Sequence, residues 1–218
     1  MSEVDDVYNA MAEKIATTED DLRHVGRMNT SRKLQNDLEI MRNGNDLFIT
    51  GINATGPVHQ GKESIADSLK SGYRGRILVL DPRSDVFFER AEKEDDSVGR
   101  ILTEMEASFG ILHDVVDNIK HSPNLIIGLH KYPYCAMVTG MHHDDGDMQV
   151  NLYPEGRGVR GLTGKTYQFS SRGITKELFD LGVDYFESLK EASDLLSVND
   201  IRDFRKELRN IRMRKYSI

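Results

Sequence analysis

Two short apolar runs, in residues 47–52 and 77–80, dominate the hydrophobic pattern of the chain. Leu47, Phe48 and Ile49 open the first run, and the second reads Ile77-Leu78-Val79-Leu80. Both runs favour buried β-strands. Between them, residues 62–71 place apolar side chains at helical spacing, and Gly72 follows as a suitable helix C-cap. The pattern predicts a βαβ unit with parallel strands, whose ligands bind at the carboxyl ends of the strands.

The rest of the chain continues this mixture of helical and extended patterns. A 3.6-residue apolar period predicts helices over residues 98–119 and 175–196. Narrower apolar stripes predict helices over 1–21 and 198–216 and another before Gly44. Four short apolar segments predict further strands, at 124–129, 135–138, 148–153 and 167–169. We therefore predict an α/β fold, a mixed β-sheet with helices on both faces and flanking terminal helices. We expect three parts along the chain: an N-terminal helical segment (1–33), the α/β domain (34–196) and a basic C-terminal helix (197–218).

Composition and charge describe a globular protein with one large core. The chain has 218 residues, of which 38% are hydrophobic and 30% charged, and its net charge is −7. The acidic balance argues against broad coating of nucleic acid. Cys135 is the one cysteine, so no intrachain disulfide can form. With no long apolar segment and no signal-peptide core, a cytoplasmic protein is expected.

Residues 56–63 nearly match a P-loop. Gly56, Gly61 and Lys62 stand where that motif requires them, but Glu63 replaces the hydroxyl residue that would hold magnesium. Pro57 also lacks a backbone donor. The alternative interpretation is an ordinary turn before a helix N-terminus, where Glu63 is favourable. A looser anion site at that helix start stays open.

Two other segments carry candidate chemistry. Residues 142–147 read HHDDGD, which suits either a divalent metal ion or a hairpin turn. Adjacent histidines in a strand point apart, so we assign no metal site. The C-terminal helix is basic, and Arg205, Arg209 and Arg212 could contact nucleic-acid phosphates; packing in a dimer is the alternative.

Several phrases resemble the phospholipase D-like superfamily. They are RILVLDP (76–82), the helix over 100–115 and FDLGVDYFESLKEA (179–192), within a resemblance that spans about Leu34 to Ser193. Catalytic members carry an HxKxxxxD motif. Its His, Lys and Asp places fall here on Tyr132, Tyr134 and Thr139. The resemblance therefore implies the fold and its cleft without the catalytic groups. It also implies a homodimer, which agrees with terminal helices that lack an evident partner within the chain.

These features together predict a non-catalytic, ligand-sensing or regulatory domain that binds a phosphate-bearing small molecule. We assign no catalytic residue and no cofactor. Predicted ligand contacts lie mainly at the strand ends and in the glycine-rich loop after residue 153: Asn53, Thr55, His59, Lys62, Asp81, His130, Lys131, Tyr132, Arg157 and Arg160. Two alternatives stay open. One is a phosphodiesterase or nucleotide-processing enzyme, and the other is a nucleic-acid-associated regulator that uses the C-terminal helix.

Overall fold

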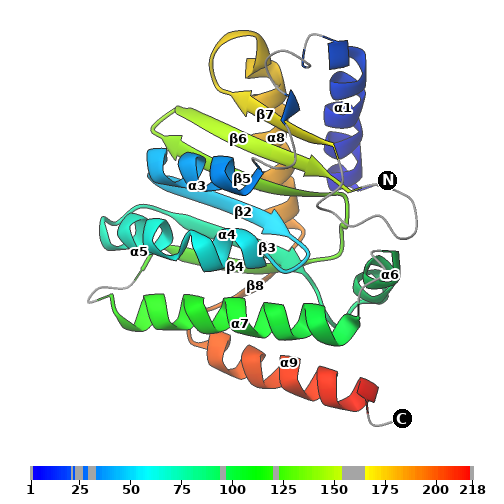
Figure 1. Ribbon diagram of the computed structural model, residues 1–218, viewed down its shortest axis with the longest axis vertical. Coiled ribbons are helices and arrows are strands. Elements are labelled where there is room, and N and C mark those ends of the chain that lie inside the picture. Colours follow the sequence, from blue (N-terminus) through cyan, green and yellow to red (C-terminus); the bar gives the residue numbers. More distant parts are fainter. Residues whose placement is uncertain are drawn as a thin grey trace.

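An eight-stranded mixed sheet forms the centre of the protein in the computed structural model (Figure 1). The structure describes residues 2–20, 22, 27–28, 33–93, 97–119, 123–153 and 165–216. The strands are β1 (Arg27–Met28), β2 (Asp46–Gly51), β3 (Gly75–Leu80), β4 (Leu125–His130), β5 (Cys135–His142), β6 (Asp145–Leu152), β7 (Thr166–Ser170) and β8 (Asp194–Leu196). Their order across the sheet is β1-β7-β6-β5-β2-β3-β4-β8.

The middle of the sheet is parallel and its flanks are antiparallel. β2 pairs with β3, and β3 with β4, in parallel register. This confirms the predicted βαβ unit. β5, β6 and β7 continue the sheet on one side as antiparallel neighbours, and β8 pairs antiparallel with β4 on the other. The carboxyl ends of β2, β3 and β4 therefore meet at one edge, which we call the carboxyl edge.

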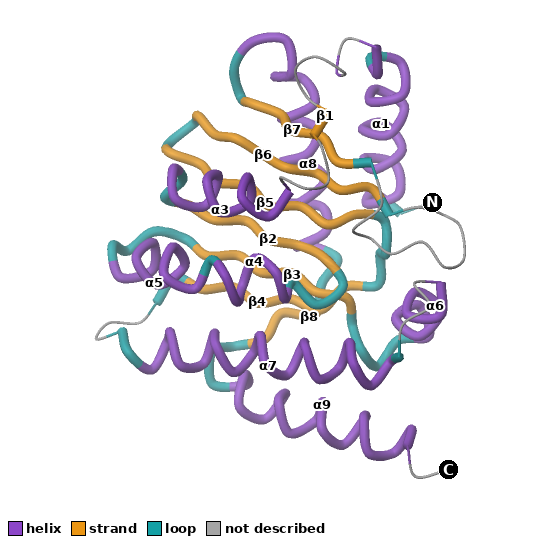
Figure 2. The backbone as a smooth tube through the Cα atoms, in the orientation of Figure 1, coloured by secondary structure: helices purple, strands orange, loops and turns teal. Residues whose placement is uncertain are grey.

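Helices cover both faces of the sheet, as the α/β prediction requires. The helices are α1 (Glu3–Thr17), α3 (Lys33–Asn43), α4 (Thr55–Gln60), α5 (Lys62–Lys70), α6 (Asp85–Lys93), α7 (Val98–Asp117), α8 (Lys176–Glu191) and α9 (Asp200–Tyr216). Neighbouring side chains on β2 point to opposite faces of the sheet and pack in separate hydrophobic cores. Ile49 packs in the core beneath α7, and Phe48 stacks on Phe186 of α8 with ring centres 5.1 Å apart. Figure 2 shows α9 alongside α7, on the side away from the sheet.

Both terminal helices pack within their own chain. Val4, Met11 and Ile15 of α1 are buried, and this helix lies against α8. On α9, the buried Phe204 packs against Phe109 of α7 with ring centres 4.9 Å apart. The expectation that these apolar stripes lack a partner within the chain is therefore wrong. The predicted homodimer loses that argument and stays a prediction.

Several element boundaries differ from the sequence-based expectation. The predicted turn over residues 139–147 belongs mostly to a long β5–β6 hairpin, which pairs His142 with Asp145. The predicted helix over 175–196 ends at Glu191, and the chain then forms β8. The helix predicted before Gly44 is α3, which ends at Asn43. β1, which was not among the predicted strands, pairs with β7 at the edge of the sheet.

Within the described residues, no helix combines the length and the apolar character that a membrane span needs.

Candidate ligand-binding site

The carboxyl edge gathers six of the predicted contact residues. Asn53 and Thr55 follow β2, and Asp81 follows β3. His130 ends β4, and Lys131 and Tyr132 come next. The structure places two others elsewhere. His59 and Lys62 lie on α4 and α5 over the face of the sheet (Figure 2). Arg157 and Arg160 lie outside the described residues.

The near-P-loop segment is helical. Residues 55–60 form α4 and residues 62–70 form α5, so their backbone N–H groups serve helix hydrogen bonds such as Val58 N to Ala54 O, at 3.0 Å. Gly61 joins the two helices and packs against Met41 of α3. The P-loop interpretation is wrong for this segment. The predicted helix after it is present as α5, but the turn expected before that helix is itself mostly helical.

His130 is enclosed at the end of β4. Its side chain is 2% exposed, and its Nε2 lies 3.3 Å from Thr50 Oγ1. Its Nδ1 accepts a hydrogen bond from the backbone N–H of Tyr132, at 3.2 Å. Burial lowers the pKa of His130 to about 3, against the opposing charge of Asp81. The imidazole is therefore neutral near pH 7, and both ring nitrogens have protein partners.

The carboxylate of Asp81 also has hydrogen-bond partners within the protein. It is 3% exposed, and one of its oxygens accepts hydrogen bonds from the backbone N–H of Arg83 and from Arg83 Nε, at 2.9 and 2.8 Å. The other oxygen accepts from Arg83 Nη2 at 3.1 Å. Ser84 closes the turn by donating to the Asp81 backbone oxygen at 2.7 Å. Asp81 therefore shapes the turn into α6 and has little capacity left for a ligand.

Tyr132 and Tyr134, on which the His and Lys places of the HxKxxxxD motif fall, pack together beside the carboxyl edge. The Tyr134 hydroxyl donates to Asp5 of α1 at 2.6 Å, and its ring stacks on Tyr8 of the same helix with centres 4.5 Å apart. Tyr132 packs beside Tyr134, with ring centres 6.1 Å apart. Burial and the hydrogen bond to Asp5 raise the pKa of Tyr134 to about 12. We call Tyr8, Tyr132 and Tyr134 the tyrosine cluster, which joins α1 to the carboxyl edge.

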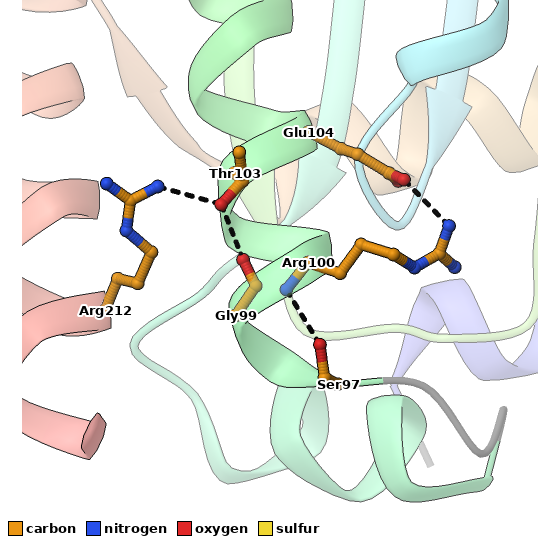
Figure 3. Close-up of a pocket in the computed structure, with 6 residues that line it drawn as sticks. All are labelled: Ser97, Gly99, Arg100, Thr103, Glu104 and Arg212. Carbon is orange, nitrogen blue, oxygen red and sulfur yellow. Dashed lines mark hydrogen bonds and ion pairs between the residues drawn. The ribbon is translucent and has the colours of Figure 1, made fainter.

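An open pocket lies beside this edge, at the start of α7. Asn53 Nδ2 donates to Glu104 Oε2 of α7 at 2.9 Å, which joins the end of β2 to the pocket wall. The pocket has a volume of about 520 Å³. Its lining consists of Ser97, Gly99, Arg100, Thr103 and Glu104 from the start of α7 and Arg212 from α9 (Figure 3).

Arg100 of α7 and Arg212 of α9 both line this pocket, with their guanidinium groups on opposite sides of α7 (Figure 3). Arg100 pairs with Glu104 at 2.9 Å, and Arg212 donates to the Thr103 hydroxyl at 2.8 Å (Figure 3). Thr103 in turn donates to the Gly99 carbonyl at 2.7 Å, which fixes the orientation of the hydroxyl. The Arg100 and Arg212 side chains remain 51% and 34% exposed. Both side chains are therefore accessible to solvent, and each already has partners within the chain.

Charged groups of both signs lie around the pocket. Glu106 accepts from Arg209 at 2.5 Å and lies 3.5 Å from Arg212. Arg100 shares the neighbouring carboxylate of Glu104 with Asn53. Among the described residues, three guanidinium groups therefore lie near these two carboxylates. This arrangement suits an anion with several acceptor oxygens, such as a phosphate group.

The basic face predicted for nucleic acid is turned largely toward α7. Arg209 and Arg212 contact Glu106, as described above, and the guanidinium group of Arg205 lies over Gly110. These three arginines are therefore engaged within the chain. A nucleic acid would have to displace them before it could use them for phosphate contacts.

The HHDDGD segment forms the tip of the β5–β6 hairpin. His143 sits in the turn with φ of 56°, and Asp145 forms an ion pair with Arg172. A smaller pocket of about 220 Å³ lies alongside, lined in part by His142, Asp145 and Arg172. No group of three His, Cys, Asp or Glu side chains able to hold a metal occurs among the described residues. The hairpin interpretation is confirmed.

The sequence prediction missed Arg83, Arg100 and Glu104. Arg83 had a local signal, because it follows Asp81-Pro82 in a turn. Arg100 and Glu104 had a weaker one, an opposite-charge pair spaced by four residues at the start of a helix. Arg212 was singled out for nucleic acid only. Nothing in the sequence indicated that α9 would bring it to α7.

Compared with known proteins, the chain matches no protein-family model, and no curated protein matches it.

Proposed function

We propose that the chain is a non-catalytic, phospholipase D-like domain that senses or responds to a phosphate-bearing small molecule. The ligand binds beside the carboxyl edge, with its phosphate in the pocket between α7 and α9. The observation that carries this proposal is the pair of half-exposed guanidinium groups of Arg100 and Arg212 in one pocket. The family assignment rests on the sequence phrases alone.

The burial and the hydrogen bonds of the polar groups at the strand ends support a non-catalytic function. His130 is buried, neutral and hydrogen-bonded at both nitrogens. Asp81 is occupied by Arg83, and Tyr134 by Asp5. A nucleophile or general acid has to reach the substrate with a suitable pKa, and none of these three groups meets that requirement.

The first test is thermal unfolding of the whole chain against nucleotides, cyclic dinucleotides, sugar phosphates and inorganic pyrophosphate, with each mixture then checked for product. A ligand at one hundred times its Kd adds about 2.7 kcal/mol to the free energy of unfolding, a shift of several degrees. A shift without product is expected from at least one phosphate compound. A shift with turnover would establish the enzyme alternative and overturn the proposal.

Arg100→Ala is the variant that locates the site. It removes one guanidinium group from the pocket, so the ligand-induced shift should shrink to a small fraction of its wild-type size. Lys176→Ala is the matched control, because Lys176 is an exposed cation that pairs with Asp180 on α8, across the sheet. An equal loss in both variants would mean that phosphate compounds act through general charge effects.

A further inference from the structure

We propose that the first half of α3, residues 33–38, is a pH-sensitive segment, which lies on the sheet in mildly acidic solution and opens locally as the pH rises to neutrality. The inference is independent of the proposed function, because α3 packs on β5 and β6, away from the pocket between α7 and α9 (Figure 1). It rests on the polar side chains that are buried between this half of the helix and β6.

The two halves of α3 are attached to the sheet in different ways. Ile40 and Met41 of the second half are buried in the core. Gly140 of β5 lies directly against the Ile40 carbonyl group, which leaves no room for a side chain at residue 140. In residues 33–38, by contrast, Asp37 is the one buried side chain, and Leu34 is half-buried. Apolar packing therefore anchors the second half, and the first half depends on its polar contacts.

Those polar contacts meet at Gln149 of β6. The Asp37 side chain is 4% exposed, and its carboxylate accepts a hydrogen bond from Gln149 Nε2 at 2.5 Å. The same amide nitrogen donates to the Lys33 carbonyl at 3.2 Å, and Gln149 Oε1 accepts from Asn36 Nδ2 at 3.0 Å. One buried side chain of the sheet thus binds three residues in the first half of α3. The donor to the Asp37 carboxylate is an uncharged amide, so a negative charge there is poorly compensated.

The elements packed against α3 bring little charge to this place. The second half of α3 meets β5 through Val138 and Gly140, and the first half meets β6 through Gln149. α4 and α5 meet α3 at Gly56 and Gly61, both uncharged. The ionisable residues around that junction are exposed, and Asp147 of β6 lines the smaller pocket at the other end of α3: His59, Lys62, Glu63 and Asp147.

Ionisation of Asp37 therefore works against the closed position. Burial raises the pKa of its carboxyl group from 3.8 to about 7, although Lys33 favours the ionised form. In an open segment water would solvate the carboxylate, and the pKa would return toward 3.8. Between these two values the closed segment binds more protons than the open one, so rising pH favours opening. Above about pH 7 the effect levels off, because Asp37 is then ionised in both states.

Amide hydrogen exchange at pH 5.5 and 7.5, in wild type and Asp37→Asn, tests this opening. Both proteins are compared at the same pH, so the intrinsic pH dependence of exchange cancels. For the amides of residues 37–39, the opening constant of wild type relative to the variant should rise up to about 25-fold between the two pH values. In wild type at pH 7.5 these amides should also exchange at least about tenfold faster than those of residues 41–43.

Glu39→Gln is the matched control, because Glu39 is an exposed carboxylate on the same helix. This variant should keep the full pH response of wild type. Loss of the response in Glu39→Gln would overturn the inference, because the surface charge of the helix would then cause it.

Two further results would overturn the inference. A ratio of wild type to Asp37→Asn that changes less than about twofold with pH would show that Asp37 titrates alike in the closed and open segment. Equal exchange rates in residues 37–39 and 41–43 would show that the segment opens only when the whole chain unfolds. Neither result depends on phosphate binding, so this inference and the proposed function can fail separately.

Discussion

The buried polar groups of this protein and the polar groups of the α7–α9 pocket differ in their exposure to solvent. His130, Asp37 and Arg76 are almost fully buried, and each has partners fixed by the fold. The side chains of Arg100 and Arg212 are 51% and 34% exposed, and both line a pocket that is open to solvent. Enclosed groups should therefore govern stability and its pH dependence, and the pocket groups should govern ligand binding. Each prediction below tests one side of this contrast.

The largest stability effect is expected at Asp37. Its carboxylate accepts a hydrogen bond from Gln149 at 2.5 Å, and burial raises its pKa to about 7, with Lys33 opposing the shift. The native state thus binds more protons than the unfolded state between pH 3.8 and 7, and this group lowers stability as the pH rises through that window. Asp37→Asn should stabilise the protein at pH 8 by up to roughly 4 kcal/mol.

Urea unfolding at pH 8 and pH 4 measures that effect, with the exposed Asp203→Asn as control. At pH 4 the gain should nearly vanish. The lowered pKa of His130 acts in the opposite direction, so Asp37→Asn should also expose a loss of stability as the pH falls from about 6.5 toward 3. A loss at pH 8 would show that the charged carboxylate is favourable in the native state.

The ion pair of the buried Arg76 with the partly exposed Glu187 should have the next largest effect. Arg76 is 7% exposed, lies over the Phe48 ring and pairs with Glu187 of α8. Glu187→Ala should cost about 3 kcal/mol, because it leaves a buried cation without its carboxylate. The double variant Arg76→Met with Glu187→Ala should recover most of the loss. A single-variant cost below about 1 kcal/mol would place this pair with the exposed ones.

Thr139 should show a smaller effect of opposite sign. Its hydroxyl is fully buried, and no hydrogen-bond partner for it occurs among the described residues. Thr139→Val keeps the shape of the side chain and removes the unsatisfied polar group. It should therefore raise the free energy of unfolding by about 1 kcal/mol. A loss measured by urea unfolding would reveal a partner for the hydroxyl.

Arg212→Ala should have the smallest effect on stability. Its side chain is about one third exposed, so loss of its contacts to Thr103 and Glu106 should cost less than about 1 kcal/mol. Pyrophosphate should nevertheless lose most of its stabilising effect in this variant. A large stability loss in urea, with ligand stabilisation retained, would break the contrast between enclosed and pocket groups.

Much of the fold follows from local hydrophobic patterns. The 3.6-residue period predicted the helix over 98–119, and α7 occupies Val98–Asp117. The two apolar runs became the neighbouring parallel strands β2 and β3. The β5–β6 hairpin was longer than predicted, because polar residues such as His142 and Asp145 extend it beyond the core. Short β8 forms by pairing with β4, a long-range contact that its own sequence does not encode.

The candidate site was predicted only in part, because it depends on contacts between elements that are distant in the sequence. The carboxyl edge follows from the parallel strands, so Asn53 was placed correctly beside it. Lys62 was correctly predicted to begin a helix, but residues 55–60 form the additional helix α4, so Lys62 lies away from the carboxyl edge. The pocket depends on α9 packing against α7, so Arg100 and Arg212 meet only through tertiary structure. His130 and Asp81 are of types that are common in active sites, but tertiary packing buries both of them.

The most direct test of the central claim is the affinity for pyrophosphate, measured by titration calorimetry at fixed ionic strength in wild type, Arg100→Ala and Tyr132→Phe. If the pocket binds phosphate, Arg100→Ala should weaken binding at least about tenfold, as expected for one charge-assisted hydrogen bond, and Tyr132→Phe should leave it unchanged. The reverse result, with binding weakened by Tyr132→Phe and kept in Arg100→Ala, would move the ligand to the tyrosine cluster and contradict the assignment of the pocket.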